Sequence, residues 1–280
     1  MLTTLIEGLG FAEGLRWHNQ RLWYADFLTR QVQSIGLNGD IRREAFVPGQ
    51  PSGLGFMPDG TPLVVSMLDK KLLRYEPEQL HIVADLSPFS RHACNDMLID
   101  PEGNAYIGTF SYDIWYDTHP SPSASSDLLH VSPDGNVSIV ASGLKMPNGI
   151  VRLPHSNTLV VAETGACRLL AFDIHRDGSL SPARVFADLV DIHPDGLCVN
   201  ANGDIWVAGL YACEFLRVSH TGDIIERLPT PGRWAVACVL GGSDGKRLFC
   251  ATTVVSRAND MRQGRCTSAI EFVDVATGKP

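Results

Sequence analysis

Four short motifs share a pattern of three residues. The first residue has a side chain that carries oxygen, the second is glycine or aspartate, and the third is apolar. The motifs begin at Glu13, Asn95, Asn148 and Asp195. Carboxylate and amide oxygens are the ligands that hard divalent cations prefer, and two carboxylates brought together without a cation repel each other. No lysine or arginine occupies an equivalent position. If the fold brings the four side chains together, they are therefore expected to hold a divalent metal ion.

Each motif taken alone has a simpler interpretation, because Asn-Gly and Asp-Gly are common turn dipeptides. The equivalence of the motifs within a repeat favours the metal site. Two further copies begin at Ser52 and near Ala237, so that successive starts lie 39, 43, 53, 47 and 42 residues apart. Each copy leads through a turn to a strongly apolar run, such as Ile205-Trp206-Val207-Ala208.

The repeat predicts an all-β fold, because short alternating runs recur between turn residues and no window shows helical spacing of apolar residues. Six units of this length, each with room for four strands, predict a single six-bladed β-propeller domain over residues 1–280. The first strand of every blade lines the central channel, so the four oxygen-bearing residues are expected at one height near the axis. The sixth unit supplies only three strands, and residues 2–7 are expected to join this last blade and close the ring.

Composition excludes several classes of partner. The 280 residues are 44% hydrophobic and 19% charged, with a net charge of -8 and no long basic run. This argues against binding to nucleic acid or to an anionic membrane. The N-terminus has neither the basic region nor the apolar stretch of a signal peptide, so we expect a cytoplasmic protein. Seven dispersed cysteines without a C-x-x-C pair are expected to be reduced thiols. The composition leaves the oligomeric state open.

The donor set bears on the identity of the metal. All four candidate ligands offer oxygen, which favours calcium and also suits magnesium or manganese. Zinc accepts carboxylates as well and can keep open positions for water.

Several motifs, in chain order, resemble the regucalcin/gluconolactonase family. The most specific are Glu13-Gly14-Leu15-Arg16-Trp17, Met146-Pro147-Asn148-Gly149-Ile150 and His193-Pro194-Asp195-Gly196-Leu197. The resemblance implies a six-bladed propeller of metal-dependent lactonases and related hydrolases. It also implies that Glu13, Asn148 and Asp195 are metal ligands, that Asn95 lies on the substrate side, and that Asp195 acts as the general base.

The activity implied by this resemblance is hydrolysis of a small-molecule lactone. Water associated with the metal would attack the ring ester, and Asp195 would accept its proton. No G-x-S-x-G motif indicates a serine nucleophile. Two alternatives remain open: another metal-dependent ester or phosphoester hydrolase on the same site, and a non-catalytic calcium-binding propeller scaffold.

One departure from the family concerns substrate recognition. Many sugar lactonases of the family carry an arginine two residues before the position of Asn95, where it contacts substrate hydroxyls. This chain has Ala93 there, and Arg91 and His92 just upstream. We therefore include Arg91 and His92 among the candidate substrate-binding residues.

A long connection is the second candidate determinant of specificity. In a four-stranded blade, the connection between the second and third strands returns to the face where the ligands lie. Most of these connections are short, but residues 110–126 in the third blade and residues 253–265 in the sixth are long. The former carries Tyr112 and Trp115. We expect it to act as a lid whose rings pack on the apolar part of the substrate, which favours a lactone with fewer hydroxyls than an aldonolactone.

Overall fold

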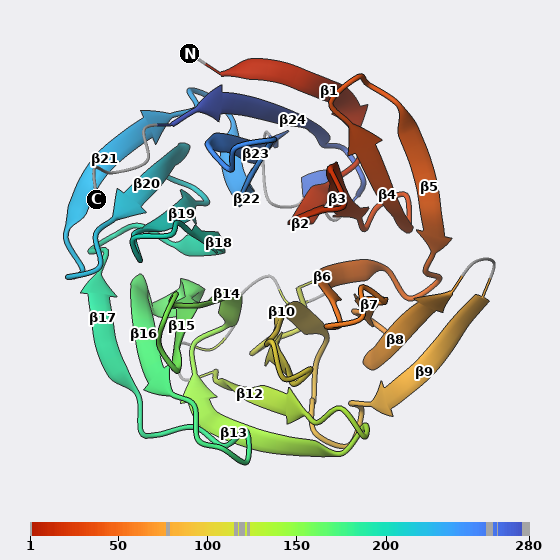
Figure 1. Cartoon of the computed structure of the whole chain (residues 1–280), viewed down its shortest axis with the longest axis vertical. Coiled ribbons are helices and arrows are strands. Elements are labelled where there is room, and N and C mark those ends of the chain that lie inside the picture. The colour runs from red at the N-terminus through yellow and green to blue at the C-terminus, as the bar shows by residue number, and fades with distance from the viewer. Residues whose placement is uncertain are drawn as a thin grey trace.

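Six antiparallel four-stranded sheets surround a central axis in the computed structural model (Figure 1). The structure describes residues 2–76, 79–114, 117, 121, 124–255, 260–261 and 263–275. The predicted all-β fold with six blades is confirmed. In every blade the strands follow one another outward from the axis, so the first strands β2, β6, β10, β14, β18 and β22 lie innermost (Figure 1).

The first five blades are built from consecutive strands. Their bounds, blade by blade, are β2 (Ala12–His18), β3 (Arg21–Asp26), β4 (Gln31–Gly36) and β5 (Ile41–Phe46); β6 (Pro51–Phe56), β7 (Pro62–Ser66), β8 (Lys71–Glu76) and β9 (Gln79–Asp85); β10 (Cys94–Ile99), β11 (Ala105–Thr109), β12 (Ser126–Val131) and β13 (Val137–Leu144); β14 (Pro147–Arg152), β15 (Thr158–Glu163), β16 (Arg168–Asp173) and β17 (Arg184–Asp188); β18 (Pro194–Val199), β19 (Ile205–Gly209), β20 (Glu214–Val218) and β21 (Ile224–Pro229). A 3-10 turn, η1 (Thr164–Ala166), connects β15 to β16.

The sixth blade combines both ends of the chain. It contains β22 (Trp234–Gly241), β23 (Arg247–Val254) and β24 (Thr267–Asp274), and its outermost strand is β1 (Thr3–Leu9). β1 runs antiparallel to β24, with Thr3 opposite Phe272. This pairing places the N-terminal strand beside the last strand of the chain and covers the edge of β24 (Figure 1).

The apolar core lies between neighbouring blades. Five of six buried clusters join two adjacent sheets. The remaining cluster joins the first and sixth blades and also includes Met67 and Leu210. In the cluster between the fourth and fifth blades, for example, Val160 of β15 packs with Leu197 of β18 and Val207 of β19. Burying a side chain of this size stabilises the fold by about 1.5–3 kcal/mol. The inner strands are consequently fixed relative to one another by packing on both sides.

A bulge recurs near the start of the inner strands. In β14, Pro147 pairs with Glu163 and Ile150 pairs with Val161. The chain therefore advances three residues along β14 while it advances two along β15. Asn148 lies inside this bulge, and the same shift occurs at Asn95 and Asp195. Bulges of this kind redirect side chains and are common beside functional sites. Here the bulges place the residue that follows the first paired residue of the inner strand, such as Asn148 after Pro147, at the axis.

The glycine after the ligand position allows the inner strands to approach closely. A Cβ on Gly149 would lie 2.5 Å from both the carbonyl oxygen of Asp195 and the amide nitrogen of Leu197. The third blade differs, because Asp96 stands at this position. Its carboxylate forms an ion pair with Arg16 of the first blade, 2.9 Å away.

Two further observations complete the fold. In the part of the chain that the structure describes, no helix is long and apolar enough to cross a membrane. All seven cysteines are free thiols, as expected from their spacing.

Candidate active site

The four oxygen-bearing side chains meet at the floor of one cavity on the propeller axis. Glu13, Asn95, Asn148 and Asp195 come from β2, β10, β14 and β18 and line a space of 130 Å³. Asn95 is 2% exposed, whereas Asn148 and Asp195 are each 8% exposed. Four different blades therefore contribute one polar group each to the same small volume.

The other two repeat positions do not line the cavity. Ser52 is fully buried, and its hydroxyl donates a hydrogen bond to the carbonyl oxygen of Asn95 over 3.0 Å. In the sixth blade, Ala235 pairs with Thr252 and Cys238 with Cys250. This register makes Val236, rather than Ala237, the equivalent of Asp195. The prediction was wrong by one residue because Val236-Ala237 has neither the oxygen-bearing side chain nor the glycine that marks this position in other copies.

Two carboxyl groups at the floor are electrostatically unfavourable as anions. Burial, and then the negative charges of Asp195, Asp96 and Asp26, raise the pKa of Glu13 well above its ordinary value. Burial and Asp96 likewise raise the pKa of Asp195, although a hydrogen bond with the Asn148 side chain opposes this shift. Arg16 supplies a positive charge nearby, but its guanidinium is bound to Asp96 and to the carbonyl oxygen of Met97.

Hydrogen bonds between blades hold the floor in place. The Asn95 amide donates to the carbonyl oxygen of Pro147 over 3.2 Å, which ties β10 to β14. The Thr164 hydroxyl donates to the carbonyl oxygen of Pro194 over 2.6 Å, which ties the fourth blade to β18. Each accepting carbonyl immediately precedes a floor residue. The positions of Asn148 and Asp195 are thereby set by their neighbours as well as by their own strands.

The floor residues fit a hard divalent cation. Glu13 and Asp195 supply two negative charges whose repulsion a cation would relieve, and Asn148 and Asn95 supply neutral oxygens. Among the described residues, no group of three or more His, Cys, Asp and Glu side chains is placed to hold a metal ion. A metal at the floor would thus depend on two carboxylates supplemented by amide oxygens, a donor set typical of calcium and related ions.

The walls of the cavity are apolar and come from all six blades. The apolar and aromatic lining residues are Phe11, Phe27, Met67, Phe110, Tyr112, Ile114, Met146, Leu210, Tyr211, Trp234 and Met261. We call this set the apolar collar. No Lys, Arg or His is found among the described residues that line the cavity. The site therefore consists of a polar, acidic floor beneath a hydrophobic wall.

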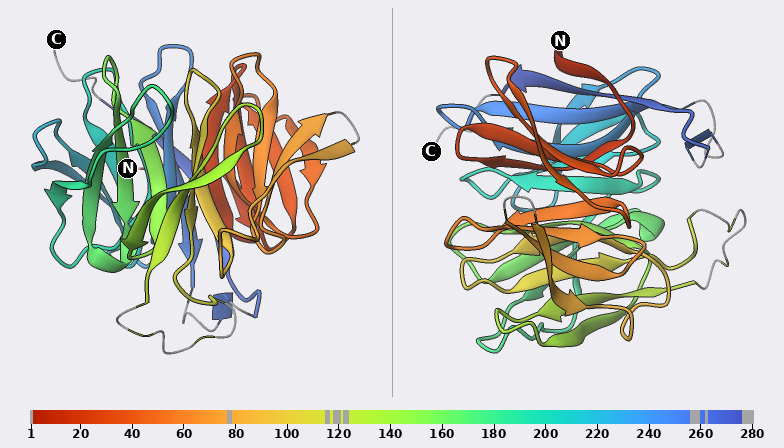
Figure 2. Two further views of the ribbon diagram at one scale, coloured as in Figure 1. Left: turned by 90° about the horizontal axis from the view of Figure 1, so that it is seen from below. Right: turned by 90° about the vertical axis from the view of Figure 1, so that its right-hand side faces the viewer.

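The sequence-predicted substrate residues are only partly brought together. Tyr112 lines the cavity, and the connections that follow β11 and β23 leave the same face of the propeller (Figure 2). Trp115 lies outside the described residues. Arg91 is exposed and His92 half-buried, and neither belongs to the cavity lining. Ala93 and Phe110 both pack against the apolar cluster that contains Phe11 and Phe27, so Ala93 contributes apolar surface at this position.

Sequence reasoning missed most of the apolar collar. Phe27, Met67 and Leu210 each follow directly after the second strand of a blade and reach the cavity. Their shared position was a usable signal, because that connection returns to the ligand face. Tyr211 and Trp234 lack such a common position. They pack edge to face, with ring centroids 4.9 Å apart and an interplanar angle of 83°.

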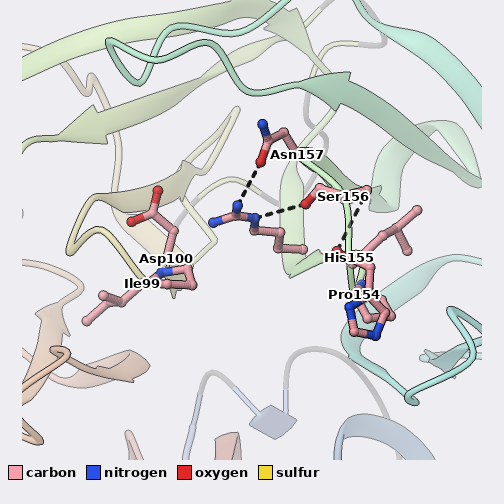
Figure 3. Close-up of a pocket in the computed structure, with 9 residues that line it drawn as sticks. Ile99, Asp100, Pro154, His155, Ser156 and Asn157 are labelled. Carbon is pink, nitrogen blue, oxygen red and sulfur yellow. Dashed lines mark hydrogen bonds between the residues drawn. The ribbon is translucent and has the colours of Figure 1, made fainter.

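A second hollow lies on the opposite face, between the β10–β11 and β14–β15 turns (Figure 3). Asp100 and His155 line it, as does Arg152. The Arg152 guanidinium donates to Glu102, to the side chain of Asn157 and to the carbonyl oxygen of Ser156. These contacts within the protein hold the β14–β15 turn, so we assign the arginine a structural role and the axial cavity the functional one.

The fold and the axial cavity together define a class: six-bladed propellers with an oxygen-lined floor suited to a divalent metal ion. Residues 11–254 match the model of the SMP-30/gluconolactonase/LRE-like family. The chain belongs to this family.

The individual relatives share about a quarter of their residues with this chain over the aligned regions. Regucalcin of Danio rerio is 24% identical over 81% of this chain and 74% of its own length. A pentonolactonase of Haloferax volcanii is 26% identical over 66% of this chain and 64% of its own length. Among solved structures, a calcium-binding regucalcin from Agrobacterium tumefaciens superposes with a TM-score of 0.79, at 22% identity, over 97% of this chain and 94% of that one. This last similarity shows the shared fold.

Proposed function

We propose that this protein is a metal-dependent lactonase that opens a cyclic ester by attack of water, with Asp195 as the general base. The observation that carries the proposal is the convergence of Glu13, Asn95, Asn148 and Asp195 on one floor beneath an apolar wall. Family membership supports the reaction class, since the family is named for gluconolactonase and one relative is named a pentonolactonase.

We assign the metal to Glu13, Asn148 and Asp195, with Asn95 on the substrate side. Calcium fits this all-oxygen set best, and the name of the solved relative from Agrobacterium tumefaciens supports it. When bound, the divalent ion would polarise the ester carbonyl and stabilise the negative charge that develops on its oxygen.

The chain's own groups would move the proton. Asp195 lies at the floor of the cavity, where its carboxylate can act as a base toward water. It would accept the proton of the attacking water and return it to the ring oxygen as the ester bond breaks. The Asn148 amide, which donates to Asp195, would hold the carboxylate in position. The apolar collar would keep bulk water away from the reacting bond.

The cavity argues against a phosphoester substrate. A phosphate group brings one to two negative charges, and proteins usually meet them with arginine, lysine or a helix N-terminus. Beside the proposed cation, the described lining offers no cationic side chain that could bind the other phosphate oxygens. A neutral ring ester needs no such partner.

A substrate panel tests the proposal directly. Metal-stripped protein would be supplied with calcium, magnesium, manganese or zinc and assayed in a pH-stat against lactones, linear esters and phosphoesters. We expect lactone opening that a chelator abolishes and one of the metals restores. Turnover restricted to linear esters or phosphoesters would replace the proposed reaction, and metal binding without any turnover would indicate a calcium-binding scaffold.

A further inference from the structure

The mouth of the axial cavity carries a pair of aromatic rings from two neighbouring blades. Tyr211 follows β19 in the fifth blade, and Trp234 begins β22 in the sixth. Both line the cavity. Tyr211 is 50% exposed, whereas Trp234 is half-buried against the cluster that contains Phe11 and Phe27. One ring is thus anchored in the core, and the other extends the aromatic surface toward solvent.

The size of the cavity limits what the floor can hold. Its volume is 130 Å³, slightly less than the about 150 Å³ of an engineered protein cavity that binds benzene. The cavity therefore has room for about one small ring. A larger substituent must extend toward solvent, and Tyr211, which packs against Trp234, is the exposed member of the described lining.

The lining also determines which substituents are favourable. Hydroxyl groups buried without partners lose roughly ten- to hundredfold in affinity each. Above the floor, the collar offers hydrogen-bonding groups on only Tyr112, Tyr211 and Trp234, and its other members are hydrocarbon or thioether side chains. Hydroxyls that face the hydrocarbon and thioether side chains of the collar would lack side-chain partners there. An alkyl or aryl group would instead remove apolar surface from water on both sides of the contact.

We propose that Tyr211 and Trp234 form a subsite for a hydrocarbon substituent, so that the preferred substrate is a five- or six-membered lactone carrying an alkyl or aryl group. This inference rests on the proposed lactonase function. It assigns substrate preference to the fifth and sixth blades, opposite the third-blade connection that the sequence singles out.

A series of γ-lactones with side chains from hydrogen to pentyl tests the subsite. We expect kcat/KM to rise by up to about fourfold per added methylene until the mouth is filled. D-glucono-lactone should be a poorer substrate than the pentyl compound. A flat series, or a preference for the sugar lactone, would overturn the proposal.

Substitutions at Trp234 and Tyr211 test whether the preference for longer side chains depends on these two rings. Trp234→Ala should lower kcat/KM for the pentyl lactone at least about tenfold more than it lowers kcat/KM for the unsubstituted lactone. Tyr211→Ser should act in the same direction, and because Tyr211 is half-exposed this change places little demand on folding. Phe46→Ala removes an exposed ring on the outer strand β5 and serves as the matched control. Equal losses across the whole series in both cavity variants would contradict a substituent subsite.

Binding without turnover separates this inference from the function on which it rests. 3-Alkylcyclopentanones carry the alkyl group at the same ring position as the γ-lactones but have no ester bond, and calorimetry gives their affinities directly. Affinity that rises with chain length and falls in Trp234→Ala supports the subsite, even if no lactone is opened and the proposed lactonase function fails. Lactone turnover accompanied by ketone affinities independent of chain length overturns the subsite and leaves the lactonase function standing.

Discussion

Asp195 has two proposed roles, metal ligand and general base, and one substitution can separate them. Asp195→Asn keeps an oxygen that can reach the metal but removes the lone pair that accepts a proton. We expect kcat to fall by roughly 10²–10⁴, the usual contribution of a general base, while metal is retained. Steady-state kinetics and elemental analysis of the same preparation measure both effects.

Asp191→Asn provides the control for this substitution, because Asp191 is an exposed carboxylate four residues upstream and outside the cavity lining. It should leave kcat unchanged. Near-normal turnover in Asp195→Asn with metal still bound would show that another group activates the water.

The acidic floor also predicts how stability depends on pH. Burial raises the pKa of both Glu13 and Asp195 above the ordinary values of 4.5 and 3.8. The folded, metal-free protein therefore holds more protons than the unfolded chain. Its stabilising contribution from these groups is complete below the ordinary values and is lost as pH rises through the raised pKa values.

Metal binding should reverse this trend, because protons compete with the ion for the same oxygens. In calorimetric melts from about pH 4.5 to about pH 7.5, metal-stripped protein should lose stability with rising pH, whereas the gain from added calcium should grow. Glu13→Gln should flatten the metal-free profile. A metal-free profile that rises with pH, or one that Glu13→Gln leaves unchanged, would show that the floor carboxyls are not protonated as described.

At the scale of elements, the bulges in the inner strands bring side chains from equivalent repeat positions together at the axis. The equivalence of Glu13, Asn95, Asn148 and Asp195 could be predicted because they share one repeat position and the strands share one axis. The sixth position was predicted one residue too late, since Val236 carries no side-chain oxygen and Ala237 replaces the glycine. The ion pair of Arg16 with Asp96 was also missed, because it joins blades 80 residues apart in sequence and local spacing carries no information about it.

The N-terminal strand supplies a second prediction at this scale. Leu5, Ile6 and Leu9 of β1 pack on the cluster shared by the first and sixth blades. Deleting residues 1–9 should remove these contacts and expose the edge of β24. We expect a loss of roughly 3 kcal/mol and a melting temperature lower by about 5–10 °C.

Adding the missing segment as a peptide controls for nonspecific damage. A peptide of residues 1–9 should restore part of the stability of the truncated protein, whereas the same peptide carrying Ile6→Pro should not. Truncated protein that melts like the full chain would contradict the contribution of β1.

The third-blade connection gives a prediction about specificity. Tyr112 lines the cavity, so Tyr112→Ala should change the ranking of lactones by kcat/KM while leaving metal content and melting temperature almost unchanged. Tyr112→Phe keeps the ring and should preserve the ranking. If Tyr112→Ala alters stability but not the ranking, the residue belongs to the scaffold.

For the whole molecule, the floor of the cavity could be predicted from the sequence, whereas its wall could not. The floor follows from a sixfold repeat, which sequence displays directly. The wall depends on loops of different lengths that meet only after the ring has closed, so Tyr211, Trp234 and Met261 share no spacing that a sequence could reveal. Arg91 and His92 were selected for being near Ala93 in sequence, yet neither lines the cavity.

The central claim is that one divalent ion, held by Glu13, Asn148 and Asp195, makes lactone opening possible. The most direct test is the initial rate of lactone hydrolysis as calcium is titrated into metal-stripped wild type and into Glu13→Gln. Wild type should start without measurable activity and reach its full rate at one ion per chain. Glu13→Gln should need at least about tenfold more calcium, as expected when a charged ligand is lost. Full activity in stripped wild type, or identical titration curves for the two proteins, would contradict the account.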